Sequence, residues 1–571
     1  MTDMPLAADF PRPTEEDWLG LVEKVLKGAD FERRLVSRTA DGLRIKPLYT
    51  RQDAIAGRGD LTPGAPPLLR GTHVPAGAEW DIRQVCAEPD AVAANAAILE
   101  DLAGGSTSVL LQIASPGAIG VGYEQAVMAR ALDGVMLDVA PISLVAGEYT
   151  PDAAGSLMAI WRAAGIVEGQ RRGAFNYDPL GTLAATGALY HPVEKALAIA
   201  TDLIRTTGPM PGVTALRANG HIWHLGGATE AQELALVLAS MVAYLRAAEA
   251  GGIPPAAALP KIAVTLAADA DQFLTIAKLR AARRLAWRLA DACGAADAAP
   301  RVTFTAETSA RMLTRRDPWV NMLRTTIATA AAAMGGADAI TVLPFSWALG
   351  RPDTFARRIA RNTHHILIEE AGLGRVADPA GGSWYVEQLT DTLTQSAWEA
   401  FQAIEGKGGL QAGLAAGSIQ DDLGKSQDAR RTQVATGRLP LTGTSAFPRL
   451  GDDGVRVEPW PEAQSADLNG ARVRPLGLER VAAPFEALRD NADAFEKRTG
   501  ARPRVFLAAL GPLAVNATRT TWIKNFLAAG GIEGVGAESY LTSTDAGKAF
   551  SESGASVACL CSSDEIGRAH V

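Results

Sequence analysis

Several features that define other classes of protein are scarce in this 571-residue chain. Its four cysteines are too few and too scattered for a disulfide framework or a zinc cluster. No stretch approaches the roughly 20 uninterrupted apolar residues that a membrane helix needs. The net charge of −8 argues against nucleic acid or an anionic membrane as a partner. The N-terminus has no basic segment followed by an apolar run, so no secretion signal is expected. These absences predict a reduced, cytoplasmic protein.

The length and the hydrophobic content of 47% predict two or three globular domains. Residues 1–70 are predicted to form an N-terminal arm. Within it, a short amphipathic helix over 14–28 is capped by Thr14, and residues 37–50 form a hairpin around an Asp-Gly turn. The arm has too few apolar residues for a core of its own. We therefore expect it to lie on another surface.

From about residue 106 to 406, short apolar runs alternate with long amphipathic helices. Eight runs predict buried parallel strands: 108–113, 135–140, 173–177, 213–218, 261–266, 301–305, 339–345 and 375–386. Eight strand–helix units predict an α/β fold of the (β/α)8 TIM-barrel type, which we assign to residues 71–424. The weak third and eighth runs leave a doubly wound sheet as the alternative.

Two of the helices carry clear start signals. Thr229 and Gln232 predict a capping box, and Asp317-Pro318 predicts a cap followed by a first-turn proline. The Arg-rich segment 277–290 spreads its charges around a Leu/Trp stripe, which predicts a solvated outer barrel helix.

The C-terminal part has a different composition. Residues 425–500 are rich in proline and glycine and are predicted to be a linker. Residues 501–571 begin a βαβαβ pattern that predicts a flavodoxin-like domain. Such domains normally have five strands, whereas three are predicted here, so the domain is expected to be truncated. The tail EIGRAHV matches the translation of a common sequencing adapter and is interpreted as an artefact.

In a parallel barrel, reactive side chains lie at the carboxyl ends of the strands. The residues expected there are Asp138, Asn176, Tyr177, Asp178, His221, Trp223, His224, Glu307 and Asp378. His221 and His224, in the segment GHIWHLGGAT that follows the predicted fourth strand, are the candidates for metal binding. On an extended segment their odd spacing sends the rings to opposite faces, and zinc needs a third ligand. Packed or hydrogen-bonded histidines are the favoured interpretation.

The other histidines give no stronger signal. His364 and His365 are adjacent in a helical pattern, so they point about 100° apart and are not expected to share a metal. One is expected at the surface and the other half-buried. His73 and His191 fall in loop or cap positions, and His570 falls in the suspect tail. The segment DPAGGSW (378–384) could hold a phosphate or form a tight turn. Spacing alone assigns no catalytic, cofactor-binding or metal residue.

Longer stretches resemble methylmalonyl-CoA mutases. They are LTRRDPWVNMLRTT (313–326), GGADAITVLPF (335–345), RIARNTHHILIEE (358–370) and DPAGGSWYVEQLT (378–390), together with the arm segment SRTADGLRIKPLYTRQD (37–53). The resemblance covers nearly the whole chain. It implies an arm, a barrel, a linker and a cobalamin-type domain. It also implies an adenosylcobalamin-dependent interconversion of methylmalonyl-CoA and succinyl-CoA, with the acyl-CoA threading the barrel.

The chain departs from that family at its functional motifs. Catalytic members carry RQYAG, where this chain has Val85 in place of the tyrosine. They also carry GYHMQEAGAT, which aligns His221 with the tyrosine and Ile222 with the histidine that hydrogen-bonds the thioester. Isoleucine cannot donate a hydrogen bond to a carbonyl.

The third departure concerns the cobalt ligand. Cofactor-binding members carry DxHxxG after the first strand of the C-terminal domain, and the matching positions here are Leu513, Val515 and Thr518. Valine has no lone pair for cobalt.

The resemblance therefore implies the small, non-catalytic subunit of a heterodimeric mutase. Its partner is expected to be a homologous large subunit that binds adenosylcobalamin and acyl-CoA, while this chain binds no cofactor or metal. A G-protein chaperone is a further expected partner. The alternatives are a self-sufficient acyl-CoA mutase with a diverged site and a metal-dependent barrel hydrolase that uses His221 and His224.

Overall fold

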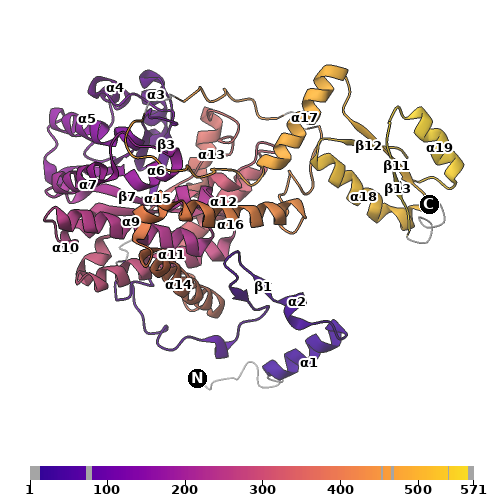
Figure 1. Cartoon of the computed structure of the whole chain (residues 1–571), viewed down its shortest axis with the longest axis horizontal. Helices are drawn as coiled ribbons and strands as arrows, with labels where there is room; N and C mark the ends of the chain where they lie inside the picture. Colours follow the sequence, from indigo (N-terminus) through magenta and orange to yellow (C-terminus); the bar gives the residue numbers. More distant parts are fainter. Residues whose placement is uncertain (1–12, 73–79, 452–453, 464–467, 538, 564–571) are drawn as a thin grey trace, which may run out of the picture.

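The computed structural model describes residues 13–72, 80–451, 454–463, 468–537 and 539–563. The arm, a helix-covered barrel and an elongated C-terminal unit follow one another along the chain (Figure 1). His73 and the tail EIGRAHV with His570 lie outside the described residues.

The arm begins with α1 (Glu15–Leu26) and α2 (Phe31–Leu35). Thr14 and Asp17 form a reciprocal capping box that starts α1, which confirms the predicted cap. The predicted hairpin is confirmed by the antiparallel pair β1 (Ser37–Arg38) and β2 (Arg44–Ile45). Neither helix contains a buried residue.

The hairpin turn nevertheless contacts the barrel. The Asp41 carboxylate accepts a hydrogen bond from the backbone N–H of Ala231, 3.2 Å away. Burial and the neighbouring Glu230 raise the pKa of Asp41 to about 6.

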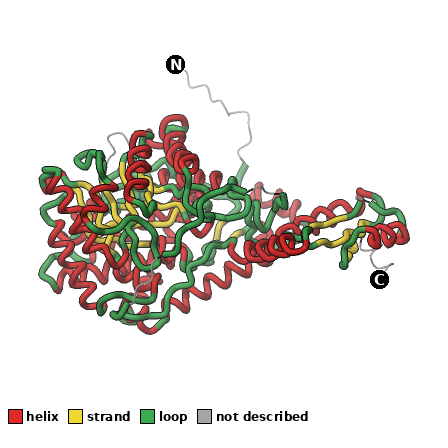
Figure 2. The backbone as a smooth tube through the Cα atoms, turned by 90° about the horizontal axis from the view of Figure 1, so that it is seen from above, coloured by secondary structure: helices red, strands yellow, loops and turns green. Residues whose placement is uncertain are grey.

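Eight parallel strands close into one barrel, which confirms the TIM-barrel prediction and excludes the doubly wound alternative. Their order around the barrel is β10-β3-β4-β5-β6-β7-β8-β9, and helices surround them (Figure 2). The strands are β3 (Asp81–Cys86), β4 (Ser108–Gln112), β5 (Ile142–Val145), β6 (Arg172–Tyr177), β7 (Gly212–Asn219), β8 (Ile262–Ala268), β9 (Phe304–Thr308) and β10 (Ala339–Thr341).

Two predicted strands are wrong and two strands were missed. Residues 135–140 form an irregular loop whose apolar Met136 and Val139 are 65% and 60% exposed. Residues 375–386 form a turn that leads into a helix. The missed strands are β3 and β5. Strand β3 carries polar Asp81 and Arg83, which pair with each other at 2.9 Å. Strand β5 has four residues and begins just after the apolar run at 135–140. Strand β7 is therefore fifth along the barrel, and GHIWHLGGAT follows the fifth strand rather than the fourth.

The helices of the barrel region are α3 (Ala91–Ala103), α4 (Gln125–Ala131), α5 (Thr150–Ala163), α6 (Pro179–Thr186), α7 (Val193–Thr207), α8 (Gly220–Leu225), α9 (Glu230–Ala250), α10 (Pro255–Ala258), α11 (Gln272–Ala292), α12 (Val320–Met334), α13 (Thr354–His365), α14 (Trp384–Glu405), α15 (Gly409–Ala416) and α16 (Ser418–Ala435). Helix α9 is long and apolar enough to cross a membrane, but 83% of its apolar window is buried inside the protein. It is a core helix.

The predicted helix starts have different outcomes. The Thr229–Gln232 capping box begins α9, as predicted. The predicted cap at Asp317 is wrong, because α12 begins after Trp319 without a side-chain cap. Asp317 adopts a left-handed backbone conformation, with φ of 46°, and packs against Gly443. Its carboxylate is therefore held toward the linker instead of the first turn of the helix.

The predicted linker is helical at both ends. Helix α16 extends to Ala435, and α17 (Ala483–Thr499) leads into the C-terminal unit. That unit contains β11 (Arg504–Ala509), α18 (Leu513–Ala529), β12 (Glu533–Val535), α19 (Ser543–Glu552) and β13 (Ala558–Cys561). Its parallel strand order, β12-β11-β13, matches the first three strands of a flavodoxin-like sheet. The unit stands away from the barrel in both views (Figures 1 and 2).

A buried ion network ties the segment before the barrel to two outer helices. Arg280 of α11 is completely buried, and its guanidinium lies 3.0 Å from Asp378 and 2.7 Å from Glu387. Arg70 reaches the same Asp378 at 3.2 Å. The prediction of a solvated α11 is therefore wrong, because its cations are neutralised by carboxylates distant in the sequence. Asp378 belongs to this network and does not lie at a strand end as predicted.

We expect Arg280→Met to destabilise the protein by about 3–5 kcal/mol, because it removes the buried cation between Asp378 and Glu387 and leaves only Arg70 near these two carboxylates. Arg284→Met on the same helix is the matched control. Arg284 is half-exposed in its pair with Asp391, so its loss should cost about 1 kcal/mol or less. Urea denaturation followed by tryptophan fluorescence measures both, and equal losses would contradict the prediction.

Candidate functional site at the barrel mouth

The barrel mouth is the edge where the carboxyl ends of the strands open. Helix α8 begins directly after β7, because the Asn219 side chain accepts a hydrogen bond from the His221 N–H at 3.2 Å. His221 and His224 therefore lie on a helical turn, where a spacing of three places them on neighbouring positions of one side. The expected extended segment with opposed rings is wrong.

His224 is completely buried in a cluster of charged and polar groups. Its Nε2 lies 2.7 Å from the Ser309 hydroxyl and 3.3 Å from Asp269, and its Nδ1 lies 3.4 Å from Glu233. Lys278 of α11 contacts Glu233 at 2.6 Å. We call these five side chains the mouth cluster. They come from α8, α9, α11 and the ends of β8 and β9.

The carboxylates of the mouth cluster are ionised. Burial would raise the pKa of Glu233, but Lys278 and His224 outweigh it and hold that pKa at about 2. Burial likewise opposes ionisation of Asp269, yet His224, Arg311 and Lys278 hold its pKa far below the usual range. Glu233 also accepts the N–H of Ala267 at 2.8 Å. The charges are paired and hydrogen-bonded, so the mouth cluster holds α8, α9, α11 and the end of β8 together and acts as a structural brace.

His221 has separate partners. Its Nε2 accepts a hydrogen bond from the N–H of Ala310 at 3.3 Å, and its Nδ1 lies 3.9 Å from Glu307. Burial lowers the pKa of His221, although Glu307 opposes the shift. The ring is therefore neutral, with its proton on Nδ1 toward Glu307. Among the residues that the structure describes, no group of three or more His, Cys, Asp or Glu side chains is arranged to hold a metal ion.

Other predicted residues at the mouth have structural contacts. Asn176 donates to the carbonyl of Leu144 at 3.0 Å. Asp178 caps α6 and accepts a hydrogen bond from Tyr244. Tyr177 and Trp223 are buried core residues. Asp138 is wrongly predicted, because it lies in the exposed loop before β5, at the opposite end of the barrel from the mouth.

Histidines elsewhere are structural as well. His364 is completely buried and accepts a hydrogen bond from the Trp80 indole at 2.8 Å, whereas half-buried His365 lies 3.2 Å from the carbonyl of Gly104. The two rings have different partners. One ring was expected at the surface, but His364 is buried and His365 is half-buried.

Sequence reasoning missed part of the mouth cluster. Asp269 and Ser309 immediately follow strands β8 and β9, so their positions alone could have identified them. Glu233 and Lys278 lie within the first two turns of α9 and α11, and only the tertiary structure brings them together.

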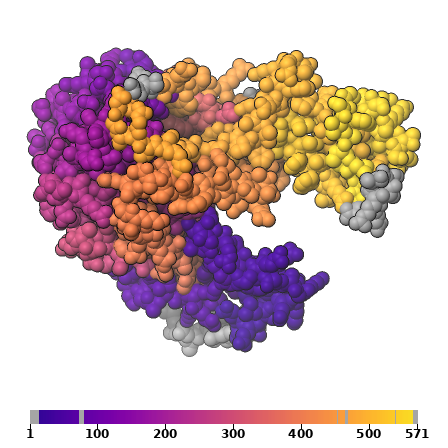
Figure 3. Space-filling model, in the orientation of Figure 1, coloured from indigo at the N-terminus to yellow at the C-terminus, as the bar shows by residue number. Residues whose placement is uncertain are grey.

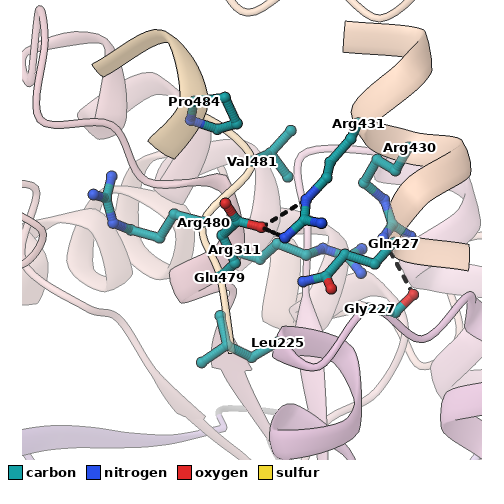
Figure 4. Close-up of a pocket in the computed structure, with 10 residues that line it drawn as sticks. All are labelled: Leu225, Gly227, Arg311, Gln427, Arg430, Arg431, Glu479, Arg480, Val481 and Pro484. Atoms are coloured by element: carbon teal, nitrogen blue, oxygen red, sulfur yellow. Dashed lines mark hydrogen bonds and ion pairs between the residues drawn. The ribbon is translucent and has the colours of Figure 1, made fainter. Parts of the chain in front are cut away.

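A segment from the linker covers one side of the mouth. Residues 476–481, here called the strap, lie beside the end of α8 (Figure 4). Glu479 pairs with Arg431 of α16 and donates its backbone N–H to the carbonyl of Leu225 at 3.3 Å. Arg430 donates to the carbonyl of Gly227, and burial together with Arg311 lowers its pKa to about 10. The space enclosed here is only about 20 Å³, room for one water molecule and not for an organic substrate.

A (β/α)8 barrel is followed along the chain by a βαβαβ unit. The family model for methylmalonyl-CoA mutase matches residues 38–518, and the chain belongs to the methylmalonyl-CoA mutase family. It is 45% identical over 577 residues to the methylmalonyl-CoA mutase small subunit of Streptomyces virginiae, covering 98% of this chain and 89% of that protein.

Two further relatives are similar along nearly their whole length. The probable methylmalonyl-CoA mutase small subunit of Mycobacterium tuberculosis is 40% identical, over 93% of this chain and 83% of its own. The methylmalonyl-CoA mutase small subunit of Propionibacterium freudenreichii subsp. shermanii is 35% identical, over 99% and 87%. Membership supports the mutase activity and not the hydrolase alternative.

Mutases of this family depend on adenosylcobalamin. The side chains of residues 513–518 show whether this segment could ligate its cobalt. Helix α18 begins at Leu513, and Val515 is 41% exposed in its first turn. Asn516 turns inward and donates to the carbonyl of Gly511 at 2.9 Å. Residues 513–518 therefore present no imidazole or carboxylate, so this segment does not fit a cobalt-ligating role.

Val85 and Ile222, the two positions that the sequence resemblance aligns with a tyrosine and a histidine, are also apolar. Val85 is buried in β3, and Ile222 is half-buried in α8 between the two histidines. Neither side chain can donate a hydrogen bond.

The low pKa of Glu233 predicts an acid-sensitive brace. A carboxylate whose pKa falls from 4.5 to about 2 on folding adds stability above pH 4.5, and that stability is lost as the pH falls toward 2. Its size is on the order of 3 kcal/mol.

We expect the stability difference between wild type and Glu233→Gln to shrink as the pH falls below about 4.5. Urea denaturation at several pH values measures it. Glu249→Gln, exposed near the end of the same helix, should match wild type throughout. A pH-independent difference for Glu233→Gln would refute the assignment.

Proposed function

We propose that this chain is the small, non-catalytic subunit of a heterodimeric, adenosylcobalamin-dependent methylmalonyl-CoA mutase. A homologous large subunit binds the cofactor and the acyl-CoA and carries out the interconversion of methylmalonyl-CoA and succinyl-CoA. The observation that carries the proposal is the chemistry of three positions. Val85, Ile222 and Val515 stand where catalytic relatives have a tyrosine, a thioester-binding histidine and a cobalt ligand.

The contacts at the barrel mouth support the same proposal. Glu233 and Asp269 of the mouth cluster are already paired with Lys278 and Arg311, so their charges are neutralised within the protein. The strap fills one side of the opening. A self-sufficient mutase would need a polar donor directed at the substrate carbonyl, and the family position for that donor holds Ile222.

The arm supports the existence of a partner. Helix α1 has 12 residues and none of them is buried, whereas isolated helices of this length are marginal in water. Leu21 and Val25, one turn apart on α1, are 61% and 79% exposed. A second chain that covers this face would stabilise the helix. In this proposal residues 1–70 form the interface arm, 71–424 the barrel, 425–500 the linker and 501–571 a degenerate cobalamin-type domain.

The location and the remaining partner follow from the proposal. The heterodimer works in the cytoplasm, and a G-protein chaperone acts on the assembled enzyme through the cofactor-loaded large subunit.

Expression tests the proposal directly. We expect this chain alone to bind no cobalamin and to show no turnover of methylmalonyl-CoA, because it lacks the ligand and the donors. Co-expression with a large subunit should give active enzyme. Absorbance of bound cobalamin and a coupled succinyl-CoA assay measure the two properties.

The large subunit expressed alone is the control. Stoichiometric cobalamin on this chain by itself would overturn the proposal in favour of a self-sufficient mutase.

The arm gives a second test. We expect the double variant Leu21→Asp, Val25→Asp to weaken association with the large subunit at least tenfold, since it places charges on an apolar contact. Leu439→Asp, 37% exposed in the linker, is the control and should associate normally. Sedimentation velocity measures the dissociation constant. Unchanged association of the arm variant would exclude α1 from the interface.

A further inference from the structure

An aromatic groove lies at the root of the arm. It has a volume of about 630 Å³ and separates the hairpin from the first turns of α11 and α14. Residues 45–49 form one wall, and Phe273 with residues 382–385 form the other. We call this surface the aromatic groove. In sequence, Phe273 lies between Asp269 and Lys278 of the mouth cluster, on the opposite wall of the groove from residues 45–49.

Aromatic rings form a continuous row across the groove. The Tyr385 ring lies 5.0 Å from Tyr49 and 5.2 Å from Phe273, measured between ring centroids. Trp384 stands beside them on α14. Trp384, Phe273 and Leu48 are 38%, 45% and 39% exposed. Large rigid rings that remain half-exposed in a concave surface are the residues that most often dominate protein interfaces.

The groove is almost free of charge. Of the residues that line the groove, Lys46 carries a charge. Its ammonium already contacts Asp53 at 2.5 Å and faces the Tyr49 ring at 6.0 Å. A charged ligand therefore gains little here. An apolar segment gains from the burial of the exposed rings.

The groove and the arm helix are parts of one surface. The Thr50 hydroxyl donates to Glu15 at the start of α1, 3.4 Å away, so α1 begins beside the groove. On the other side, Gln388 of α14 donates to the carbonyl of Asp53 at 2.7 Å and holds the groove to the barrel. A broad hollow lies between the arm and the C-terminal unit (Figure 3). The start of α1 and the groove therefore belong to the same part of the arm.

We infer that the aromatic groove is an anchor site that receives an apolar segment of the large mutase subunit. The inference rests on the proposed function, since that function supplies the partner. Continuity with α1 favours this occupant. Because α1 begins beside the groove, a chain that covers α1 lies near the half-exposed rings, which offer it an apolar surface. The groove adds its half-exposed rings to the apolar surface that α1 offers a partner.

The test uses the full-length chain with its large subunit. We expect Phe273→Ser combined with Trp384→Ser to raise the dissociation constant of the heterodimer at least tenfold. The conservative pair Phe273→Tyr with Trp384→Phe should restore association to within about threefold, since it keeps the aromatic surface. Leu541→Ser, 80% exposed on the C-terminal unit, is the matched control. Sedimentation velocity gives the constants, and circular dichroism establishes that each variant folds.

A second readout follows Trp384 itself. Titration with the large subunit should shift tryptophan emission to shorter wavelength in wild type, and Trp384→Phe should lose most of that shift.

Each outcome bears on one claim. If the wild-type chains do not associate, the proposed function fails. If they associate and the Ser variants bind as tightly as wild type, the groove is not the anchor and the proposed function stands. If the Ser variants instead break up a homodimer of this chain and leave the heterodimer intact, a second copy occupies the groove and the inference is overturned.

Discussion

The barrel mouth depends on one buried carboxylate. Glu233 is ionised without access to solvent, and an unpaired charge in that position would be prohibitively costly. It can remain there only while Lys278, the N–H of Ala267 and His224 stay in place around it. Helices α8, α9 and α11 and the end of β8 are therefore fixed relative to one another. These contacts hold the barrel mouth in one arrangement, and its charged groups are already paired with each other.

This arrangement gives the departures from the catalytic motifs a structural meaning. Ile222 lies in the short helix whose His224 enters the mouth cluster, so the segment that would face a substrate serves to hold the barrel together. The strap closes the adjacent space, and the start of α18 presents apolar and amide side chains. A chain built in this way contributes shape and surface to an assembly. The exposed arm and the aromatic groove are where that contribution is concentrated.

Much of the barrel could be predicted from the sequence, because β4, β6, β7 and β8 are apolar runs buried on both faces. The same apolar criterion wrongly predicted a strand at residues 135–140, where Met136 and Val139 are at the surface. It also missed β3, whose Asp81 and Arg83 satisfy each other, and β5, which has only four residues. The pairing of Glu233 with Lys278 and the Arg280 network could not be predicted. Lys278 and Arg280 lie on α11, and the carboxylates that neutralise them come from α9, α14 and the turn before α14.

The contact between Asp41 and Ala231 places the hairpin turn two positions from Glu233 on the first turn of α9. Besides its contacts with α14, the arm therefore contacts the helix end on which the mouth is built. A chain that binds the arm and displaces the hairpin turn would disturb this contact with α9. Binding of a partner at the arm could in this way alter the position of α9 at the barrel mouth.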